Sequence, residues 1–189
     1  TLEALDARHP SKHLDRFKLA IASNATTDFI LPALKVAALR RGMFLSILTG
    51  NFDQVAQDAL NPESVVNQSR PDAVLLAIDH RGLKFGGSSG ERWPDWSGDV
   101  AYEQFALLRE GFRKHSGASC LVQTVPQPPA LLFGNHDISI QGTLRAAILR
   151  FNSLLAADAP HSGDILIDVE WLASAVGLDQ WYDERNWHI

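Results

Sequence analysis

Residues 17–28 read FKLAIASNATTD, an apolar run of strand length that ends in a polar turn. Short apolar runs bounded by polar residues, Gly or Pro are typical of buried β-strands. The pattern returns four times, and each run is followed by a segment whose apolar residues have helical spacing. These further strands are predicted at Met43–Leu48, Ala73–Ile78, Ala118–Val125 and Asp164–Asp168.

Strands that alternate with helices predict an α/β domain with a parallel sheet between two layers of helices. The helices are expected at about 29–41, 52–60, 100–115, 143–157 and 171–176, and the polar residues 23–28 are expected to cap the first. Because crossover connections are right-handed, we expect a doubly wound, five-stranded, flavodoxin-like sheet in the order 2-1-3-4-5. The long connections 79–99 and 126–140 should then lie over the carboxyl edge of that sheet.

The composition is that of an ordinary globular domain: 189 residues, 46% hydrophobic, with a net charge of −5. We expect an N-terminal extension over residues 1–16 and one domain over 17–189. The chain begins with Thr and carries no signal-peptide pattern, which indicates a fragment of a longer cytoplasmic protein. The acidic balance argues against nucleic acid or an anionic membrane as the main partner, since phosphate groups are bound by clustered Lys and Arg.

Several familiar motifs are absent or out of place. The seven histidines lack metal-ligand spacing, and the chain has neither a Walker A sequence nor a G-x-G-x-x-G, so we expect no metal and no cofactor. The G-x-S-x-G string at 86–90 lacks the strand before it and the helix after it that a nucleophile elbow requires. Cys120 falls in the middle of an expected strand and is interpreted as a buried apolar residue.

Ligands of doubly wound sheets bind outside the carboxyl ends of the strands. That rule selects Ser23 after the first strand, Gly50-Asn51 after the second and Asp79-His80 after the third, with Thr124 and Asp168 after the last two. A serine in such a place could be a nucleophile beside backbone N–H groups. The alternative is that Ser23 only helps to cap the helix that follows.

Five strings together resemble the N-terminal domain of FkbH-like proteins. They are LAIASNATTDFILPAL (19–34), GNFDQVAQDALNPES (50–64), PDAVLLAI (71–78), FNSLL (151–155) and ILIDVEWLASAVGLDQWYDERNWHI (165–189). In that family a domain related to the SGNH (GDSL-type) hydrolases precedes a catalytic domain of the haloacid-dehalogenase superfamily, subfamily IIIC. The family loads a glycerate-derived unit onto an acyl carrier protein in polyketide biosynthesis.

The resemblance to SGNH hydrolases implies roles for individual residues. It makes Ser23 the nucleophile and Gly50 an oxyanion donor, while Asp183 and His188 would complete a triad. The chain departs from the pattern in two places: Asp79-His80 replaces the expected Gly-x-Asn, and Asp183 and His188 stand five residues apart instead of three.

Two functions therefore remain open. In the first, Ser23 attacks an acyl ester or thioester, His188 takes its proton, Asp183 orients His188, and Gly50 stabilises the oxyanion. Asn51, Asp79 and His80 would line the substrate site. In the second, the domain is non-catalytic and either docks an acyl carrier protein or positions a substrate for a separate catalytic domain. Arg40-Arg41 and Arg113-Lys114 are the basic pairs best suited to meet an acidic carrier.

Overall fold

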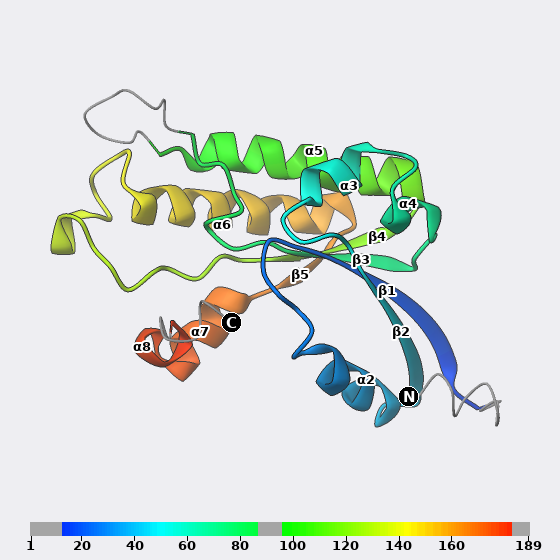
Figure 1. Cartoon of the computed structure of the whole chain (residues 1–189). Helices are drawn as coiled ribbons and strands as arrows, with labels where there is room; N and C mark the ends of the chain where they lie inside the picture. Colours follow the sequence, from blue (N-terminus) through cyan, green and yellow to red (C-terminus); the bar gives the residue numbers. More distant parts are fainter. Residues whose placement is uncertain (1–12, 87–95, 183–189) are drawn as a thin grey trace. The chain divides into compact units, whose positions relative to one another are not determined.

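The computed structural model describes residues 13–86 and 96–182 and contains the predicted five-stranded sheet (Figure 1). The strand order is β2-β1-β3-β4-β5, and the pairs β1/β2, β1/β3 and β4/β5 are parallel. The predicted fold class and strand order are thus confirmed. The strands are β1 Asp15–Ser23, β2 Met43–Thr49, β3 Ala73–Ala77, β4 Ser119–Gln123 and β5 Ile165–Ile167.

The helices follow the predicted order, with short additions. The five expected helices are α2 Leu31–Leu39, α3 Val55–Leu60, α5 Gly98–Ser116, α6 Leu144–Ser162 and α7 Val169–Val176. The additions are α4 Val65–Gln68, α8 Leu178–Trp181 and a 3₁₀ turn at Gly134–His136. Single-turn elements carry too few residues to show a period in the sequence, and this is why they were not predicted. None of the described helices has both the length and the hydropathy needed to cross a bilayer.

Contacts divide the chain into two compact units. The first comprises residues 1–77 and 111–120, and the second comprises 78–110 and 121–189. In the first unit the core consists of the end of β1 and of β3 together with residues of α4, α5 and β4. Its members are almost fully removed from solvent: Ala20, Ile21, Ala22, Val66, Val74, Leu76, Phe112 and Cys120. The prediction that Cys120 is buried is confirmed.

The helix α2 departs from the sequence prediction at its first turn. The polar run 23–28 does not cap it, because the residue before its first turn is Ile30, which offers no side-chain acceptor. Pro32 lies in the first turn, where its missing N–H costs nothing. Gly42 follows the helix with a φ of +78°, a conformation that favours glycine. None of the nine residues of α2 is buried.

In the second unit α5 and α6 run side by side (Figure 1). The rings of Phe105 and Phe151 meet edge to face, with centroids 5.5 Å apart. Gly98 lies against the α6 backbone so closely that an added Cβ would come within 2.7 Å of the Phe151 nitrogen. Thr143, predicted as the first residue of this helix, instead caps α6 by accepting the Ala146 N–H.

Candidate functional site

Ser23 is the last residue of β1 and lies in register with Ala77 of β3, at the carboxyl edge where it was predicted. Only 8% of its surface is exposed. Its hydroxyl donates to the Ala77 carbonyl at 2.9 Å and accepts the Ala25 N–H at 3.0 Å. The hydroxyl proton therefore points at a backbone carbonyl, and the oxygen closes the turn 23–25. Ser23 caps this turn and not the helix α2.

Gly50 follows β2 at the same edge, but its N–H is already engaged. It donates to the Ile21 carbonyl at 2.8 Å, and the Asn51 N–H donates to Asp58 Oδ2 at 3.2 Å. The Gly50 amide, expected to stabilise an oxyanion, and the neighbouring Asn51 amide thus both have partners inside the protein. A Cβ on Gly50 would come within 2.6 Å of Asp58 Oδ2, so a larger residue at this position would require the Asp58 side chain to move.

Asp58 is a residue that the sequence did not single out. It is 5% exposed, and this burial raises the pKa of its carboxyl group, an effect that the Asn51 N–H partly opposes. The sequence places Asp58 within a predicted amphipathic helix, where a carboxylate normally faces water. In the structure α3 begins at Val55, and Asp58 is one of its buried residues and lies against Gly50.

Asp79 and His80 lie in the second unit, directly after β3. The Asp79 carboxylate accepts the N–H groups of Arg81 and Gly82, which makes an Asx turn. The His80 ring packs edge to face against Tyr182, with centroids 6.1 Å apart, and burial lowers the pKa of His80. Tyr182 donates its hydroxyl to the Pro126 carbonyl, and burial raises its pKa to about 12.

The remaining members of the predicted triad, Asp183 and His188, lie outside the described residues, as does most of the G-x-S-x-G string at 86–90. The structure therefore brings Ser23 and Gly50 to one edge of the first unit and leaves the triad a prediction. Within residues 13–86 and 96–182, no three His, Cys, Asp or Glu side chains gather as metal ligands would.

A polar network joins the carboxyl ends of β4 and β5 in the second unit. Thr124 donates its hydroxyl to Asp168 and accepts the Glu170 N–H, while Asp168 caps α7 by accepting the Trp171 N–H. Asn152 of α6 makes two hydrogen bonds with the Val125 backbone and donates to Glu170 Oε2 at 2.8 Å. This network fixes the position of the Glu170 carboxylate.

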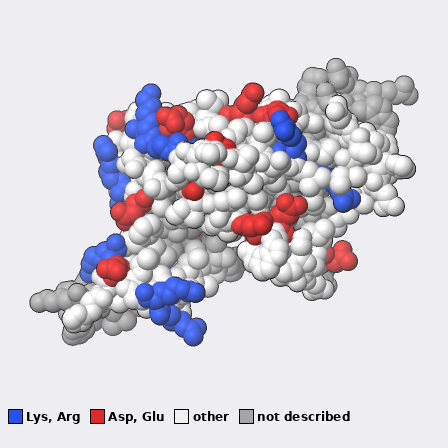
Figure 2. Space-filling view, turned by 180° about the vertical axis from the view of Figure 1, so that it is seen from behind, with Lys and Arg blue, Asp and Glu red and all other residues white. Residues whose placement is uncertain are grey.

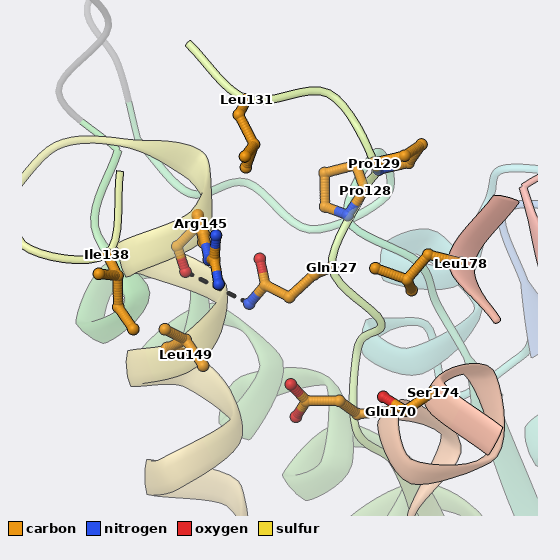
Figure 3. Close-up of a pocket in the computed structure, with 10 residues that line it drawn as sticks. All are labelled: Gln127, Pro128, Pro129, Leu131, Ile138, Arg145, Leu149, Glu170, Ser174 and Leu178. Carbon is orange, nitrogen blue, oxygen red and sulfur yellow. Dashed lines mark hydrogen bonds between the residues drawn. The ribbon is translucent and has the colours of Figure 1, made fainter. Parts of the chain in front are cut away.

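Beside that network lies a cavity of about 330 Å³, walled by α6, α7 and the loop after β4 (Figure 3). Its polar groups are Gln127, Arg145, Glu170 and Ser174. The apolar part of its wall consists of Pro128, Pro129, Leu131, Ile138, Leu149 and Leu178. Half of this wall belongs to the loop 126–140, which was predicted to lie over the carboxyl edge of the sheet. The two charged residues, Arg145 and Glu170, belong to α6 and α7 and were not predicted.

Comparison with known families supports the resemblance seen in the sequence. The family model described as "FkbH, N-terminal domain" matches residues 18–187, which is most of the chain. No curated protein matches it.

Solved structures share the fold at low sequence identity. The N-terminal part of a Bacteroides fragilis protein that contains a phosphatase domain, determined with Mg, superposes with a TM-score of 0.78 at 12% identity. That match covers 96% of this chain and 48% of the other, so the present chain spans about half the length of that relative. Axe2, an acetylxylan esterase from Geobacillus stearothermophilus, matches with a TM-score of 0.53 at 14% identity, over 87% of this chain and 81% of the esterase.

Proposed function

The chain belongs to the FkbH N-terminal domain family, and we propose that it is a binding domain that docks an acyl carrier protein. In this proposal the domain presents the acyl group to a separate catalytic domain and does not turn it over itself. The observation that carries the proposal is the hydrogen bonding of Ser23, whose hydroxyl proton goes to the Ala77 carbonyl.

A serine nucleophile needs a base for its proton and free donors for the oxyanion that forms. A peptide carbonyl is no such base, and the Gly50 and Asn51 amides are engaged with Ile21 and Asp58. The Asp58 carboxylate beside Gly50 would also repel a developing negative charge when it is ionised. These three features favour a structural role for Ser23.

The distribution of charge between the two units supports docking of an acidic partner to the first. The first unit has ten Lys and Arg against eight Asp and Glu, whereas the second has seven against fourteen. Arg40-Arg41 and Arg113-Lys114 both belong to the first unit, which is the more basic half of this acidic chain. An acidic carrier protein would be attracted there and repelled by the second unit.

The two basic pairs form separate sites. Arg40-Arg41 follow the last residue of α2, and Arg113-Lys114 lie in the last turn of α5. These helices cover opposite faces of the strands of the first unit (Figure 1). On the face shown in Figure 2, Lys and Arg form small groups with Asp and Glu beside most of them. A carrier would therefore use one pair, and each pair needs its own test.

Two measurements test the proposal. The wild-type chain and Ser23→Ala should show the same negligible hydrolysis of p-nitrophenyl acetate. Titration calorimetry should detect binding of a cognate acyl carrier protein. Replacing both residues of one basic pair with Glu should weaken this binding, and the same change in the other pair should not. Arg150→Glu, in the second unit, is a control for charge reversal, with half the change in net charge. Hydrolysis that depends on Ser23, or carrier binding that survives reversal of each pair, would refute the proposal.

A second candidate function is acyl transfer or ester hydrolysis through Ser23. It is favoured by the place of Ser23 at the end of β1 and by the fold shared with an acetylxylan esterase. Under this mechanism Ser23→Ala should lower turnover by about 10⁴-fold, and His188→Ala by a similar factor, since members of a triad act as a unit. Cys120→Ala should change it little.

A further inference from the structure

The cavity beside α6 and α7 contains two opposite charges that do not pair. Arg145 and Glu170 both line it, yet in the part of the chain that the structure describes the Arg145 guanidinium forms neither an ion pair nor a hydrogen bond. Glu170 accepts one hydrogen bond, from Asn152, and has no cationic partner there. No guanidinium nitrogen of Arg145 lies within 4.0 Å of a Glu170 carboxylate oxygen, so a gap separates the two groups.

Two polar atoms on the cavity wall are also buried without a hydrogen-bond partner among residues 13–86 and 96–182. They are Nε of Arg145 and Oε1 of Gln127, whose amide nitrogen is held by the Arg145 carbonyl at 3.3 Å. A buried donor or acceptor without a partner costs free energy, and a cation costs more than a neutral group. Both atoms are shielded from solvent, so a ligand that turned the Arg145 and Gln127 side chains toward the cavity would satisfy a donor and an acceptor.

The rest of the wall is apolar and partly open. Leu149 and Leu178 form its inner part, while Leu131 and Ile138 remain 43% and 56% exposed. Figure 3 shows these side chains around the space into which Arg145, Gln127 and Glu170 project. A volume of about 330 Å³ lies within the range of small-molecule sites, which combine apolar walls with a few fixed polar groups.

We propose that this cavity binds a small zwitterion with an apolar side chain, that is, an amino acid of the leucine or phenylalanine class. Its carboxylate would meet the guanidinium of Arg145, and its ammonium would donate to Glu170 and to Gln127 Oε1. Its side chain would cover the exposed faces of Leu131 and Ile138. The site lies wholly in the second unit and does not depend on how the first unit meets a carrier.

The hydrogen bonds of Glu170 make it a clean position to test. Its Oε2 accepts from Asn152, and a glutamine carbonyl can accept the same bond, so Glu170→Gln removes the charge and keeps the network. Arg145→Gln removes the opposite charge, and Arg145→Lys restores it if the first variant is unstable. Two exposed residues supply charge-matched controls: Arg150→Gln, also on α6, and Glu103→Gln on α5.

The experiment is titration calorimetry of the chain with three probes: L-phenylalanine, 3-phenylpropanoate, which lacks the ammonium, and 2-phenylethylamine, which lacks the carboxylate. L-phenylalanine should bind about tenfold or more tightly than either analogue, since each lacks one charge-assisted hydrogen bond. Arg145→Gln and Glu170→Gln should each weaken its binding by a similar factor. Arg145→Gln should leave 2-phenylethylamine binding unchanged, and Glu170→Gln should leave 3-phenylpropanoate binding unchanged.

The alternatives give distinct results. Equal binding of L-phenylalanine and 3-phenylpropanoate, unaffected by Glu170→Gln, would identify a site for simple carboxylates and overturn the proposal. Binding that persists in both charge variants, or that the two control variants weaken as much, would place the ligand elsewhere. No binding of L-phenylalanine at millimolar concentration to a chain with a cooperative thermal transition would also overturn it.

Discussion

The carboxylate of Asp58 shows how one buried side chain can decide what its neighbours do. It accepts the Asn51 N–H, and so occupies a donor that an oxyanion could use. It also lies so close to Gly50 that a larger residue there would displace it. Nothing in the sequence around residue 58 indicates burial, because a single Asp in a short helix normally faces solvent. The burial of Asp58 can be seen only in the structure, which shows how the first turn of α3 lies against Gly50.

The raised pKa of Asp58 predicts the pH dependence of stability. Burial makes the folded chain hold this proton more tightly than the unfolded chain, whose carboxyl has a pKa near 3.8. The contribution of Asp58 to the free energy of unfolding is therefore most favourable below the pKa of the unfolded chain. It is lost as the pH rises through the raised pKa of the folded chain. Asp58→Asn should stabilise the chain at neutral pH, and the gain should vanish near pH 3.

Urea unfolding at the two pH values measures this difference. Glu63→Gln, at an exposed position of the same unit, is the control and should show no such trend. A loss of stability in Asp58→Asn at neutral pH would show that the Asn51 hydrogen bond to the ionised carboxylate outweighs its desolvation.

Arg109 offers a second test at the scale of single residues. Its guanidinium pairs with Asp164 at 2.6 Å and with Asp158 at 2.8 Å, and the Asp164 side chain is only 1% exposed. Arg109→Met should destabilise the chain by about 3–5 kcal/mol, because it leaves that carboxylate buried without its cation. Adding Asp164→Leu should restore part of the loss. Arg150→Met, which breaks the exposed pair with Asp99, should change the unfolding midpoint little.

At the scale of elements, the apolar runs identified all five strands. The central strand Ala73–Ala77 is a continuous apolar stretch because it is largely buried on both faces, whereas the edge strands β2 and β5 are only half-buried. The ends of helices were harder to predict. The polar run 23–28 resembles a helix cap. In the structure the Ser23 hydroxyl instead accepts the N–H of Ala25, two residues further along the chain, and α2 begins at Leu31 without a side-chain cap. Local sequence cannot show which of several polar residues the chain will place at the first turn.

Gly111 is a helical position where replacement by alanine should destabilise the chain. Replacing glycine with alanine inside a helix normally stabilises it by about 1 kcal/mol. Here an added Cβ would lie 2.6 Å from the Ala59 carbonyl oxygen, so α5 and α3 would have to separate. We expect Gly111→Ala to lower the thermal midpoint. Lys114→Ala, at an exposed position one turn on, is the control, and a rise in midpoint for Gly111→Ala would contradict the close packing.

At the scale of the whole molecule, the sequence predicted the topology and the edge that carries Ser23 and Gly50. The sequence did not predict which hydrogen bonds Ser23 and Gly50 make. The same polar residues at strand ends suit catalysis or turn formation, and the choice depends on hydrogen-bond partners distant in sequence, such as Ala77 for Ser23. The cavity formed by Arg145 and Glu170 depends likewise on the packing of α6 and α7, which no local motif encodes.

The separation of charge predicts how carrier binding responds to salt. Attraction between an acidic carrier and exposed basic residues is screened as ionic strength rises, and the Debye length falls from about 10 Å at 0.1 M to about 3 Å at 1 M. The dissociation constant should therefore rise over this range, mainly through a slower association rate. Affinity independent of salt would contradict docking through Arg40-Arg41 or Arg113-Lys114.

The helix α2, which buries none of its residues, has a consequence for the motions of the native chain. The residues of α2 are at most half-buried, so less apolar contact is lost when it opens than when a helix with a buried face does. Its amide protons should therefore be released by local fluctuations below the free energy of global unfolding. In native-state hydrogen exchange, the amides of α2 should exchange quickly and with little dependence on denaturant. Those of α6, which buries Ile148, Phe151 and Leu155, should exchange only when that unit unfolds.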